Sequence, residues 1–594
     1  MGVDSAGAVR EDRGGRFPGD SARSIGGVLP GPLAAAAAHR AIAMALLGLL
    51  FASFAVQVLG IFHRNINWDE FLFLSNVYRA ARGEGVGLLQ TAYVHLFGWL
   101  TRIGGDEIAQ IIAARALYLA LWAGSLALLY RLARQLIDPL GALAGVVLFA
   151  LFSFSLTHAV SFRIDGLVLP VLLAVALLLL KPTTTRLAAA GALSGVALAL
   201  SIKAVLWAPA FTAVLAVGLW RRQSRVKPVL AGALAAVGTF GAIMLAHSWS
   251  QSAAGDPAPA ISTETLQHTG FRMLLEDGLL PRTDVLLPAL LQNPVTWGLM
   301  LAGLVLALTE LRLAPARRRA LLLLLLALPI ASLAFYANAW PYAYVVLIPT
   351  ACLLAGHALS RYLRGGDAIR TVSVGLCLAV AALPMALSAW SLSHDQQAGQ
   401  KQVLSIVHAL FDEPVPYIDK GGMVSSFPRQ PIFLSRWGLK NYRDAGQPLF
   451  ARYIRDVRPP LLIVNTPVLD VWDEDVVQRI DPAFRLLPED AEALRAAYAH
   501  YWGEIHLAGR QWRDLGAAAA VTFDIAIAGD YTLLSRGPAT VDGRTYAPGA
   551  TVPLGTGPHS LHTSTPEPDL RLLWGTDTQI PPEPPSEAPL YTGL

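Results

Sequence analysis

Two adjacent carboxylates, Asp69 and Glu70, follow the first long apolar run of the chain, in the segment "NWDE". A carboxylate held in place can accept the proton of a hydroxyl group and turn that hydroxyl into a nucleophile. The same segment also fits the start of a helix, because Asn67 and Glu70 have the spacing of a capping box and acidic residues favour the first turn. The local pattern leaves both interpretations open.

Further charged residues lie inside later apolar segments or at their ends. Arg163 and Asp165 occur in "SFRIDGLVLP", Lys203 occurs in "SIKAVLWAP", and Arg115 lies early in the second apolar segment. An ionised side chain deep in a bilayer costs about 2.5 to 3.5 kcal/mol on insertion scales, so such residues usually face a polar cavity or a partner. Alternatively, Arg163 and Lys203 extend to the membrane surface, and Arg115 forms a purely structural pair with an acid.

The composition indicates the class of protein in which these residues act. Of the 594 residues, 54% are hydrophobic and only 15% are charged, against about a quarter charged in a soluble domain. Apolar stretches long enough to span a bilayer recur up to about residue 390 and then stop. The net charge is +4, but the basic residues form short clusters between apolar segments. We therefore expect the lipid bilayer, and no nucleic acid, as a partner.

The apolar windows predict about eleven membrane-spanning helices. They cover residues 41–62, 108–130, 140–158, 166–181, 187–202, 204–220, 228–249, 294–311, 320–336, 342–360 and 369–391. Alternate loops and the N-terminus are basic, which places them in the cytoplasm by the positive-inside rule. An odd number of spans then places the C-terminal region outside. The stretch 187–220 has a second interpretation, because Ser201, Lys203 and Pro209 mark either a turn or a broken helix.

The chain divides into five predicted parts. Helical and strand-like segments alternate after the last span, and a period-two pattern between glycine-containing turns follows, which predicts an α/β domain and then a β-sandwich-like unit. The outer loops 63–107 and 250–293 of the membrane module hold most of its acids and histidines. The parts are a cytoplasmic leader, a transmembrane module, an α/β domain, a β-rich domain and a Pro-rich tail, at residues 1–40, 41–391, 392–515, 516–578 and 579–594. The predicted fold class is a mainly α-helical multi-span membrane protein with a soluble α/β and β-rich C-terminal region.

The order of these features resembles the GT-C superfamily of membrane glycosyltransferases, especially the branch with the protein O-mannosyltransferases and the aminoarabinose transferase that modifies lipid A. The matching pieces are "NWDE" beyond the first span, two surface helices, "AARALYLALWAGSLALLYRLARQL", "RID", "SIKAVLWAP" and "YANAWPYAYVVLIP". They cover most of residues 40–390. Their order and their position on one side of the membrane carry the resemblance.

The resemblance implies an inverting transfer of a sugar from a polyprenyl-phosphate-linked donor to a glycan, lipid or protein hydroxyl at the outer face. By position, Asp69 would be the general base with Glu70 as its neighbour, and Asp165 would help to hold acceptor or metal. A leaving phosphate gains negative charge that cations stabilise. The cations expected to face this phosphate are Arg115, Arg163 and Lys203.

The late outer loop departs from the resemblance. It carries the aromatic residue Tyr342 where related enzymes often place a further charged donor contact. We therefore expect Tyr342 to line the substrate site, and His268 and Arg272 in the loop 250–293 to contribute to phosphate binding. Both of these residues also fit an ordinary solvated loop.

A divalent metal ion is the candidate cofactor. Carboxylates such as Asp69 and Asp165, together with a histidine, suit such an ion. The sequence contains no spacing that specifies a complete ligand set.

Two other functions fit the same architecture. A transporter or flippase of lipid-linked sugars would usually show paired repeats and polar residues near the midplane, whereas here no clear repeat is present and the ionisable residues collect at the outer mouths of the spans. A catalytically inactive envelope scaffold would keep the architecture without the chemistry. The richness in Ala, Arg and Gly favours a bacterial source, and hence a multi-pass protein of the inner membrane with a periplasmic C-terminal region.

Overall fold

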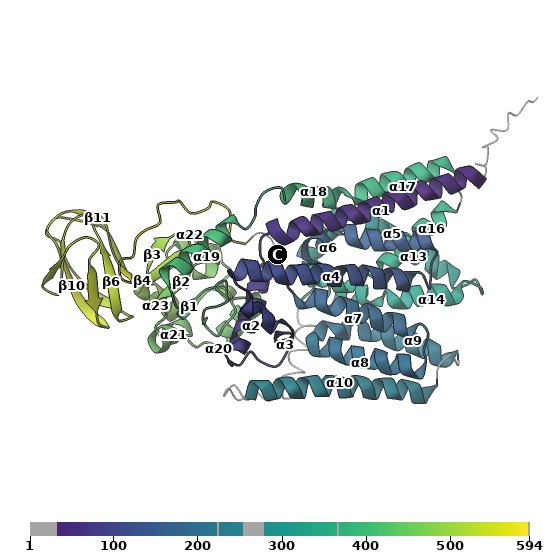
Figure 1. Cartoon of the computed structure of the whole chain (residues 1–594), viewed down its shortest axis with the longest axis horizontal. Helices are drawn as coiled ribbons and strands as arrows, with labels where there is room; N and C mark the ends of the chain where they lie inside the picture. Colours follow the sequence, from purple (N-terminus) through teal and green to yellow (C-terminus); the bar gives the residue numbers. More distant parts are fainter. Residues whose placement is uncertain (1–31, 222–224, 253–277, 365–366, 592–594) are drawn as a thin grey trace, which may run out of the picture.

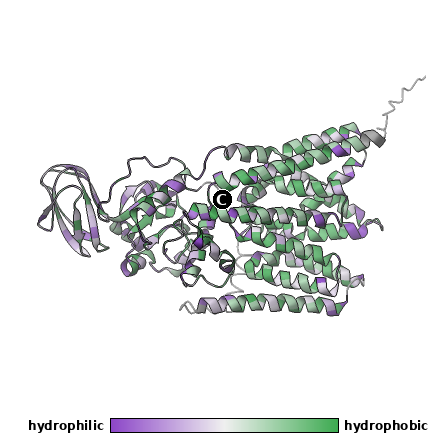
Figure 2. Ribbon diagram, viewed as in Figure 1, coloured by the Kyte–Doolittle hydropathy of each residue, from purple (hydrophilic) through white to green (hydrophobic). Residues whose placement is uncertain are grey.

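A computed structural model describes residues 32–221, 225–252, 278–364 and 367–591. A bundle of helices forms one end of the elongated molecule, and a domain of helices and strands forms the other (Figure 1). Hydrophobic residues dominate the bundle and are sparser in the second part (Figure 2). The protein is therefore a membrane protein with an additional folded domain, residues 398–591, which we call the outer domain.

Five helical segments of the described chain are long and apolar enough to cross a membrane. They are α1 (Pro32–His63), α4 (Glu107–Ala133), η2 with α9 (Ile202–Trp207 and Ala208–Trp220), α10 (Val226–Ser252) and α17 with α18 (Ala368–Ala381 and Leu383–Ser391). Three shorter apolar helices lie among them, namely α5 (Pro139–Leu151), α7 (Ile164–Leu179) and α8 (Thr184–Leu200).

Two further helix pairs are bent. α12 (Thr283–Gln292) meets α13 (Pro294–Glu310) at 94°, and η4 with α15 (Pro341–Leu347) meets α16 (Cys352–Leu363) at 61°. Because a bent pair can be either a broken span or a re-entrant loop, the number of spans stays open. The count of eleven therefore stays a prediction.

Two more of the predicted spans are also divided between helices in the structure. In the window 320–336, α14 (Arg317–Leu326) is followed by the 3₁₀ helix η3 (Leu328–Ala334), which begins beside a proline that cannot continue the α-helical hydrogen bonding. In the window 140–158, α5 ends at Leu151, and α6 (Ser153–His158) starts after an extended residue.

The stretch 187–220 contains a break and not one continuous helix. α8 ends at Leu200, and the hydroxyl of Ser201 accepts a hydrogen bond from the backbone N–H of Lys203 at 3.3 Å at the start of η2. The turn places Lys203 at the end of the bundle that faces the outer domain. α8 then packs closely on α10, where a Cβ atom at Gly191 would lie 1.9 Å from the carbonyl oxygen of Gly232. Small residues at such contacts allow helix backbones to approach in a membrane.

The predicted capping box is present at the start of α2 (Trp68–Ala81). The backbone N–H of Asp69 donates to Oδ1 of Asn67 at 2.9 Å, and the backbone N–H of Asn67 donates to Oε2 of Glu70 at 3.1 Å. The second surface helix, which the apolar spacing predicts over residues 88–100, is shorter in the structure, because the chain turns first at Gly87 and Gln90, which both have positive φ. Only α3 (Val94–Phe97) and the 3₁₀ helix η1 (Gly98–Arg102) remain.

Along the chain, the first part of the outer domain contains both helices and strands, and the last part contains strands alone. Its main helices are α19 (Ala398–Leu410), α20 (Arg436–Ala445), α21 (Phe450–Val457), α22 (Glu474–Arg479) and α23 (Pro488–Ala497). Its strands are β1 (Tyr417–Ile418), β2 (Leu461–Ile463), β3 (Tyr498–Trp502), β4 (Ile505–Leu515), β5 (Ala520–Ile525), β6 (Gly529–Leu534), β7 (Ala539–Val541), β8 (Arg544–Tyr546), β9 (Thr551–Leu554), β10 (Gly557–Thr563) and β11 (Glu567–Trp574).

The strands form two sheets. The larger sheet has the order β1-β2-β4-β11-β6-β9, with β3 also paired to β4, and the smaller has the order β5-β10-β7-β8. β1 and β2 are parallel, whereas the strands of the β-rich part pair in antiparallel fashion. Phe523 and Tyr531 lie in a common core of the β-rich part. Because β4 pairs with strands of both parts, the α/β and β-rich parts share one sheet.

The Pro-rich C-terminal segment returns to the bundle. The indole N–H of Trp502 donates to the carbonyl of Glu583 at 2.8 Å. The carbonyl of Leu590 accepts hydrogen bonds from the side chains of Asn65 and Gln400, at 2.9 and 2.7 Å. The described chain therefore ends beside the start of α2, at the junction of the bundle and the outer domain (Figure 1).

Candidate active site

A cavity of about 330 Å³ lies where the bundle meets the outer domain. The bundle contributes α2, α7, η2 and the segment around η4, and the outer domain contributes the loops after β1 and before α20. Five residues that the sequence predicted for the site line this cavity: Asp69, Arg163, Asp165, Lys203 and Tyr342. The structure therefore brings together residues from four separate segments of the membrane module.

Helix ends position the charged side chains. Asp69 and Asp165 lie in the first turns of α2 and α7, where acidic residues are stabilised by the helix dipole. Arg163 is the N-cap residue of α7 and has an extended backbone, with φ −138° and ψ 152°. Lys203 lies on the short helix η2, directly after the break that follows α8. Each group is thus on a helix terminus that packing fixes, rather than on a long loop.

The four charged groups form one connected row. Arg163 pairs with Oδ2 of Asp69, and its Nε lies 3.6 Å from Oδ2 of Asp165. Nζ of Lys203 lies 2.5 Å from Oδ1 of Asp165. Among the described residues, Oδ1 of Asp69 accepts no hydrogen bond that would occupy it. Asp69 is therefore held by one contact and keeps an oxygen for another.

Tyr342 supports both cations of this row. The guanidinium carbon of Arg163 lies 3.5 Å from the centroid of the Tyr342 ring, and Nζ of Lys203 lies 4.4 Å from it. Cation–π contacts of this kind contribute about 0.5 to 2 kcal/mol. Tyr342 was predicted to line the substrate site, and its ring lies against cations from two other segments.

Lys420, which the sequence did not single out, enters the same cavity from the outer domain. It follows β1, at the carboxyl ends of the parallel strands β1 and β2, where ligand sites often form. The backbone N–H of Lys420 donates to Oδ1 of Asn465 at 2.8 Å, and Nζ lies 3.2 Å from the centroid of the Trp68 ring. Burial lowers the pKa of Lys420 to about 8, although the nearby Asp69 carboxylate opposes this decrease.

The cavity carries more positive than negative groups. Its cations are Arg163, Lys203, Lys420 and Arg436, and its carboxylates are Asp69 and Asp165. Trp340 and Trp437 add aromatic walls. An excess of cations between aromatic walls suits an organic anion.

Tyr591 holds the outer domain against the start of α2. Its ring contacts Trp68, with centroids 5.7 Å apart, and Phe71, with centroids 6.4 Å apart. Its hydroxyl lies 3.3 Å from Nδ2 of Asn465, the residue that positions Lys420. The segment predicted to be a tail is thus part of the wall behind the cavity.

Glu70 and Arg115 lie together, but they do not line the cavity around Asp69. Arg115 forms a two-point pair with Glu70, at 2.8 and 2.5 Å. It also donates to the carbonyls of Gly60 and Ile61 in the last turn of α1, and to those of Arg64 and Asn65 directly after it. Burial alone would raise the pKa of Glu70, but Arg115 and the backbone N–H of Phe162 lower it below its ordinary value. This pair joins α1, α2, α4 and the segment before α7.

Two further donor contacts were predicted in the loop 250–293. His268 and Arg272 lie outside the described residues. Arg282, from the same outer loop, is described and buried. Its guanidinium lies 4.4 Å from the Trp340 ring centroid, and Trp340 lines the cavity.

The candidate metal ligands do not form a metal-binding set. Arg163 contacts both Asp69 and Asp165, and Lys203 contacts Asp165. In the part of the chain that the structure describes, no three His, Cys, Asp or Glu side chains come together as metal ligands. A divalent metal ion as cofactor therefore stays a prediction.

Comparison with solved structures identifies a protein with a similar fold. No protein-family model and no curated protein matches the sequence. The crystal structure of ArnT from Cupriavidus metallidurans bound to undecaprenyl phosphate superimposes with a TM-score of 0.50 and 15% identity, over 71% of this chain and 93% of ArnT. The chain has the ArnT fold. The predicted fold class, a mainly helical membrane bundle with a folded C-terminal region that contains sheets, is therefore confirmed.

Structures of a second protein are similar at lower scores. The oligosaccharyltransferase of Archaeoglobus fulgidus in its apo form gives a TM-score of 0.49 and 11% identity, over 76% of this chain and 72% of the other. Its complex with zinc and sulfate gives a TM-score of 0.47 and 12% identity, over 87% and 94% of the two chains. The fold assignment rests on ArnT alone.

Proposed function

We propose that the protein is a membrane glycosyltransferase. It moves a sugar from a polyprenyl-phosphate-linked donor to a hydroxyl group of a glycan, lipid or protein, with inversion at the anomeric carbon. The observation that carries the proposal is the row Asp69–Arg163–Asp165–Lys203 in one cavity, at the junction of an ArnT-like bundle and an outer domain. The ArnT structure that holds undecaprenyl phosphate supports this class of donor.

Asp69 is the general base in this proposal. A hydroxyl group is a weak nucleophile until a positioned carboxylate accepts its proton, and such a base typically contributes about 10² to 10⁴-fold in rate. Asp69 lines the cavity, and the capping box fixes the backbone that carries it. The hydroxyl proton passes to Asp69 as the hydroxyl oxygen attacks the anomeric carbon.

Cations stabilise the leaving group. As the new carbon–oxygen bond forms, the bond between the anomeric carbon and the phosphate oxygen breaks, and its electron pair leaves with the lipid phosphate. Arg163 and Lys203, aligned by Tyr342, would stabilise that charge, and Lys420 adds a third cation from the outer domain. Attack from the face opposite the leaving phosphate, in one step, gives inversion.

The proposal includes the side of the membrane. The cavity is lined in part by the outer domain. The loop that begins at Arg221, at the end of α9, is one of the basic loops that the positive-inside rule assigns to the cytoplasm. We propose that the cavity opens at the periplasmic face of a bacterial inner membrane, with a cytoplasmic N-terminus.

The test is transfer by the purified protein in lipid nanodiscs. The wild type is compared with Asp69→Asn, with radiolabelled polyprenyl-phosphate sugars as donors. The matched control is Asp106→Asn, because Asp106 is exposed and caps α4, a role that asparagine also fills. We expect Asp69→Asn to lose about 10³-fold in rate and to keep donor binding, while Asp106→Asn stays at the wild-type rate.

The same assay separates the enzyme from the other two functions. Movement of the labelled lipid between leaflets without transfer would identify a flippase. Donor binding without transfer or movement, in the wild type, would identify an inactive scaffold.

A further inference from the structure

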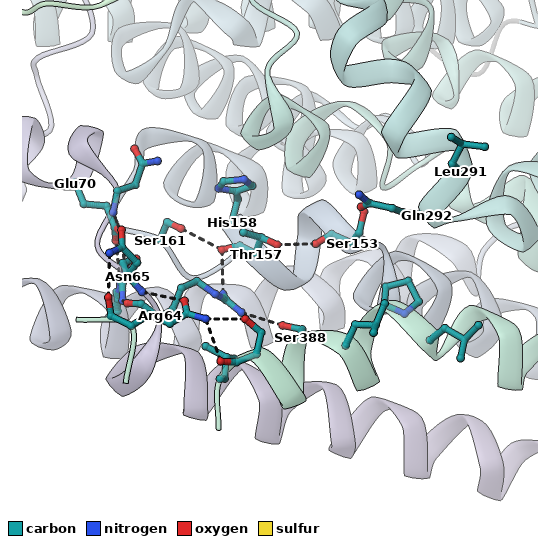
Figure 3. A pocket seen from close by; sticks show the side chains of 18 of the residues that line it. Arg64, Asn65, Glu70, Ser153, Thr157, His158, Ser161, Leu291, Gln292 and Ser388 are labelled. Carbon is teal, nitrogen blue, oxygen red and sulfur yellow. Dashed lines mark hydrogen bonds and ion pairs between the residues drawn. The ribbon is translucent and has the colours of Figure 1, made fainter. Parts of the chain in front are cut away.

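A second cavity, of about 590 Å³, lies on the Glu70 side of the acid pair. Its walls come from the end of α1, from α6, from the junction of α12 and α13, and from α17 and α18 (Figure 3). No residue lines both this cavity and the one around Asp69. It is a separate space, which the proposed transfer does not use.

Arg64 is the cation at the polar end of this cavity. Its Nη1 donates to the carbonyl of Thr157 at 3.0 Å, and its Nη2 donates to Oγ of Ser388 at 3.3 Å (Figure 3). No carboxylate of the described residues lies within ion-pair distance of Arg64, and the one carboxylate in the wall of the cavity, Glu70, is paired with Arg115. A cation largely withdrawn from water without a counter-charge is costly. The arrangement therefore has one unbalanced positive charge.

Polar side chains line one side of this cavity, and apolar side chains line the other. Ser153, Thr157 and Gln292 line the cavity near α6 and α12 (Figure 3). Leu291, Leu383 and Leu387 line its other side, and each is more than half exposed on a helix apolar enough to face lipid. The cavity is therefore amphipathic, and its apolar side is continuous with the membrane-facing surface of α18.

We infer that this cavity binds a lipid that carries a phosphate headgroup. The guanidinium of Arg64 recognises the phosphate through charge-assisted hydrogen bonds, and nearby hydroxyl and amide groups donate further bonds. The hydrocarbon chain leaves between α12 and α18, along Leu291 and Leu387. Arg64 follows directly on the apolar helix α1, which places the headgroup at the level where the headgroups of one leaflet lie.

The test measures lipid binding to the full chain in detergent by native mass spectrometry. The probes are undecaprenyl phosphate and phosphatidylglycerol, with phosphatidylcholine as the neutral comparison and inorganic phosphate as the headgroup alone. The variants are Arg64→Gln and Arg64→Lys, and the matched control is Arg221→Gln, an exposed arginine at the end of α9. Because no transfer is measured, the result does not depend on the chemistry proposed for Asp69.

We expect the wild type to retain one or both phosphate lipids in preference to phosphatidylcholine. Arg64→Gln should weaken that binding about tenfold, Arg64→Lys less, and Arg221→Gln not at all. Whichever of the two lipids binds better identifies the source of the headgroup. Equal binding by the wild type and Arg64→Gln, or binding of inorganic phosphate without either lipid, would overturn the inference.

A second variant covers the case in which Arg64→Gln does not fold. Leu387→Trp adds bulk to the apolar wall on an exposed helix and leaves Arg64 in place. Loss of lipid binding with retained binding of inorganic phosphate would support the inference. Unchanged lipid binding in a folded Leu387→Trp protein would contradict it.

Discussion

Asp69 and Glu70 are neighbours in the chain, but they lie in opposite environments. Asp69 lines a cavity and contacts Arg163, whereas Glu70 is fully buried and is bound by Arg115 and by the backbone of Phe162. The difference follows from helix geometry, because consecutive residues of α2 point in different directions. One carboxylate is free to meet a substrate, and the other joins the helices that hold the first in place.

The largest effect is expected when the partner of the buried acid, Arg115, is removed. Arg115→Met leaves Glu70 without its counter-charge and removes the hydrogen bonds that the guanidinium donates to four carbonyls at the end of α1 and directly after it. Loss of one partner of a buried pair costs about 3 to 5 kcal/mol. We expect a large decrease in the thermal unfolding midpoint in detergent. Arg221→Met, at an exposed position, serves as the control and should leave the midpoint unchanged.

A smaller effect, on activity, is expected from the pH dependence of Lys420 on the Asp69 side. Its pKa is about 8, so the side chain is charged below pH 8 and becomes neutral above it. If the cation helps to hold the donor phosphate, kcat/KM falls as the pH rises through 8, by about tenfold at pH 9. In Lys420→Arg the decrease should vanish, because arginine stays charged. The same decrease in both proteins would assign it to another group.

The smallest effect is expected at the aromatic support of the two cations. Tyr342→Leu removes the ring beneath Arg163 and Lys203, each contact being worth about 0.5 to 2 kcal/mol. We expect kcat/KM to fall by several-fold. Tyr342→Phe keeps the ring and removes only the hydroxyl, so it should stay close to the wild type. Equal losses in both variants would show that the hydroxyl, and not the ring, matters.

Sequence reasoning succeeded where the physical signal was local or periodic. The capping box at Asn67 and the charges beside apolar segments, such as Lys203, could be read directly, because a charge near a bilayer requires a reason. The GT-C resemblance supplied the order of these features and the fold that the comparison with ArnT confirms.

The sequence could not show which residues of the outer domain lie beside the cavity around Asp69. Lys420 lies in a soluble region where a lysine is ordinary, and only the parallel pairing of β1 and β2 places it over Trp68. The Pro-rich segment resembles a tail in composition, and its contacts through Tyr591 depend on a fold across the whole chain. The window 320–336 is apolar apart from Ser332 and Tyr336, so hydropathy alone could not reveal the change from α14 to η3.

The account gives Asp69 a catalytic role and Glu70 a structural role. The most direct test measures the transfer rate and the unfolding midpoint on the same samples of Asp69→Asn and Glu70→Gln. The account predicts that Asp69→Asn loses about 10³-fold in rate at an unchanged midpoint, whereas Glu70→Gln lowers the midpoint and keeps a measurable rate in the folded protein. The opposite pattern, with transfer lost in a stable Glu70→Gln protein and kept in Asp69→Asn, would contradict it.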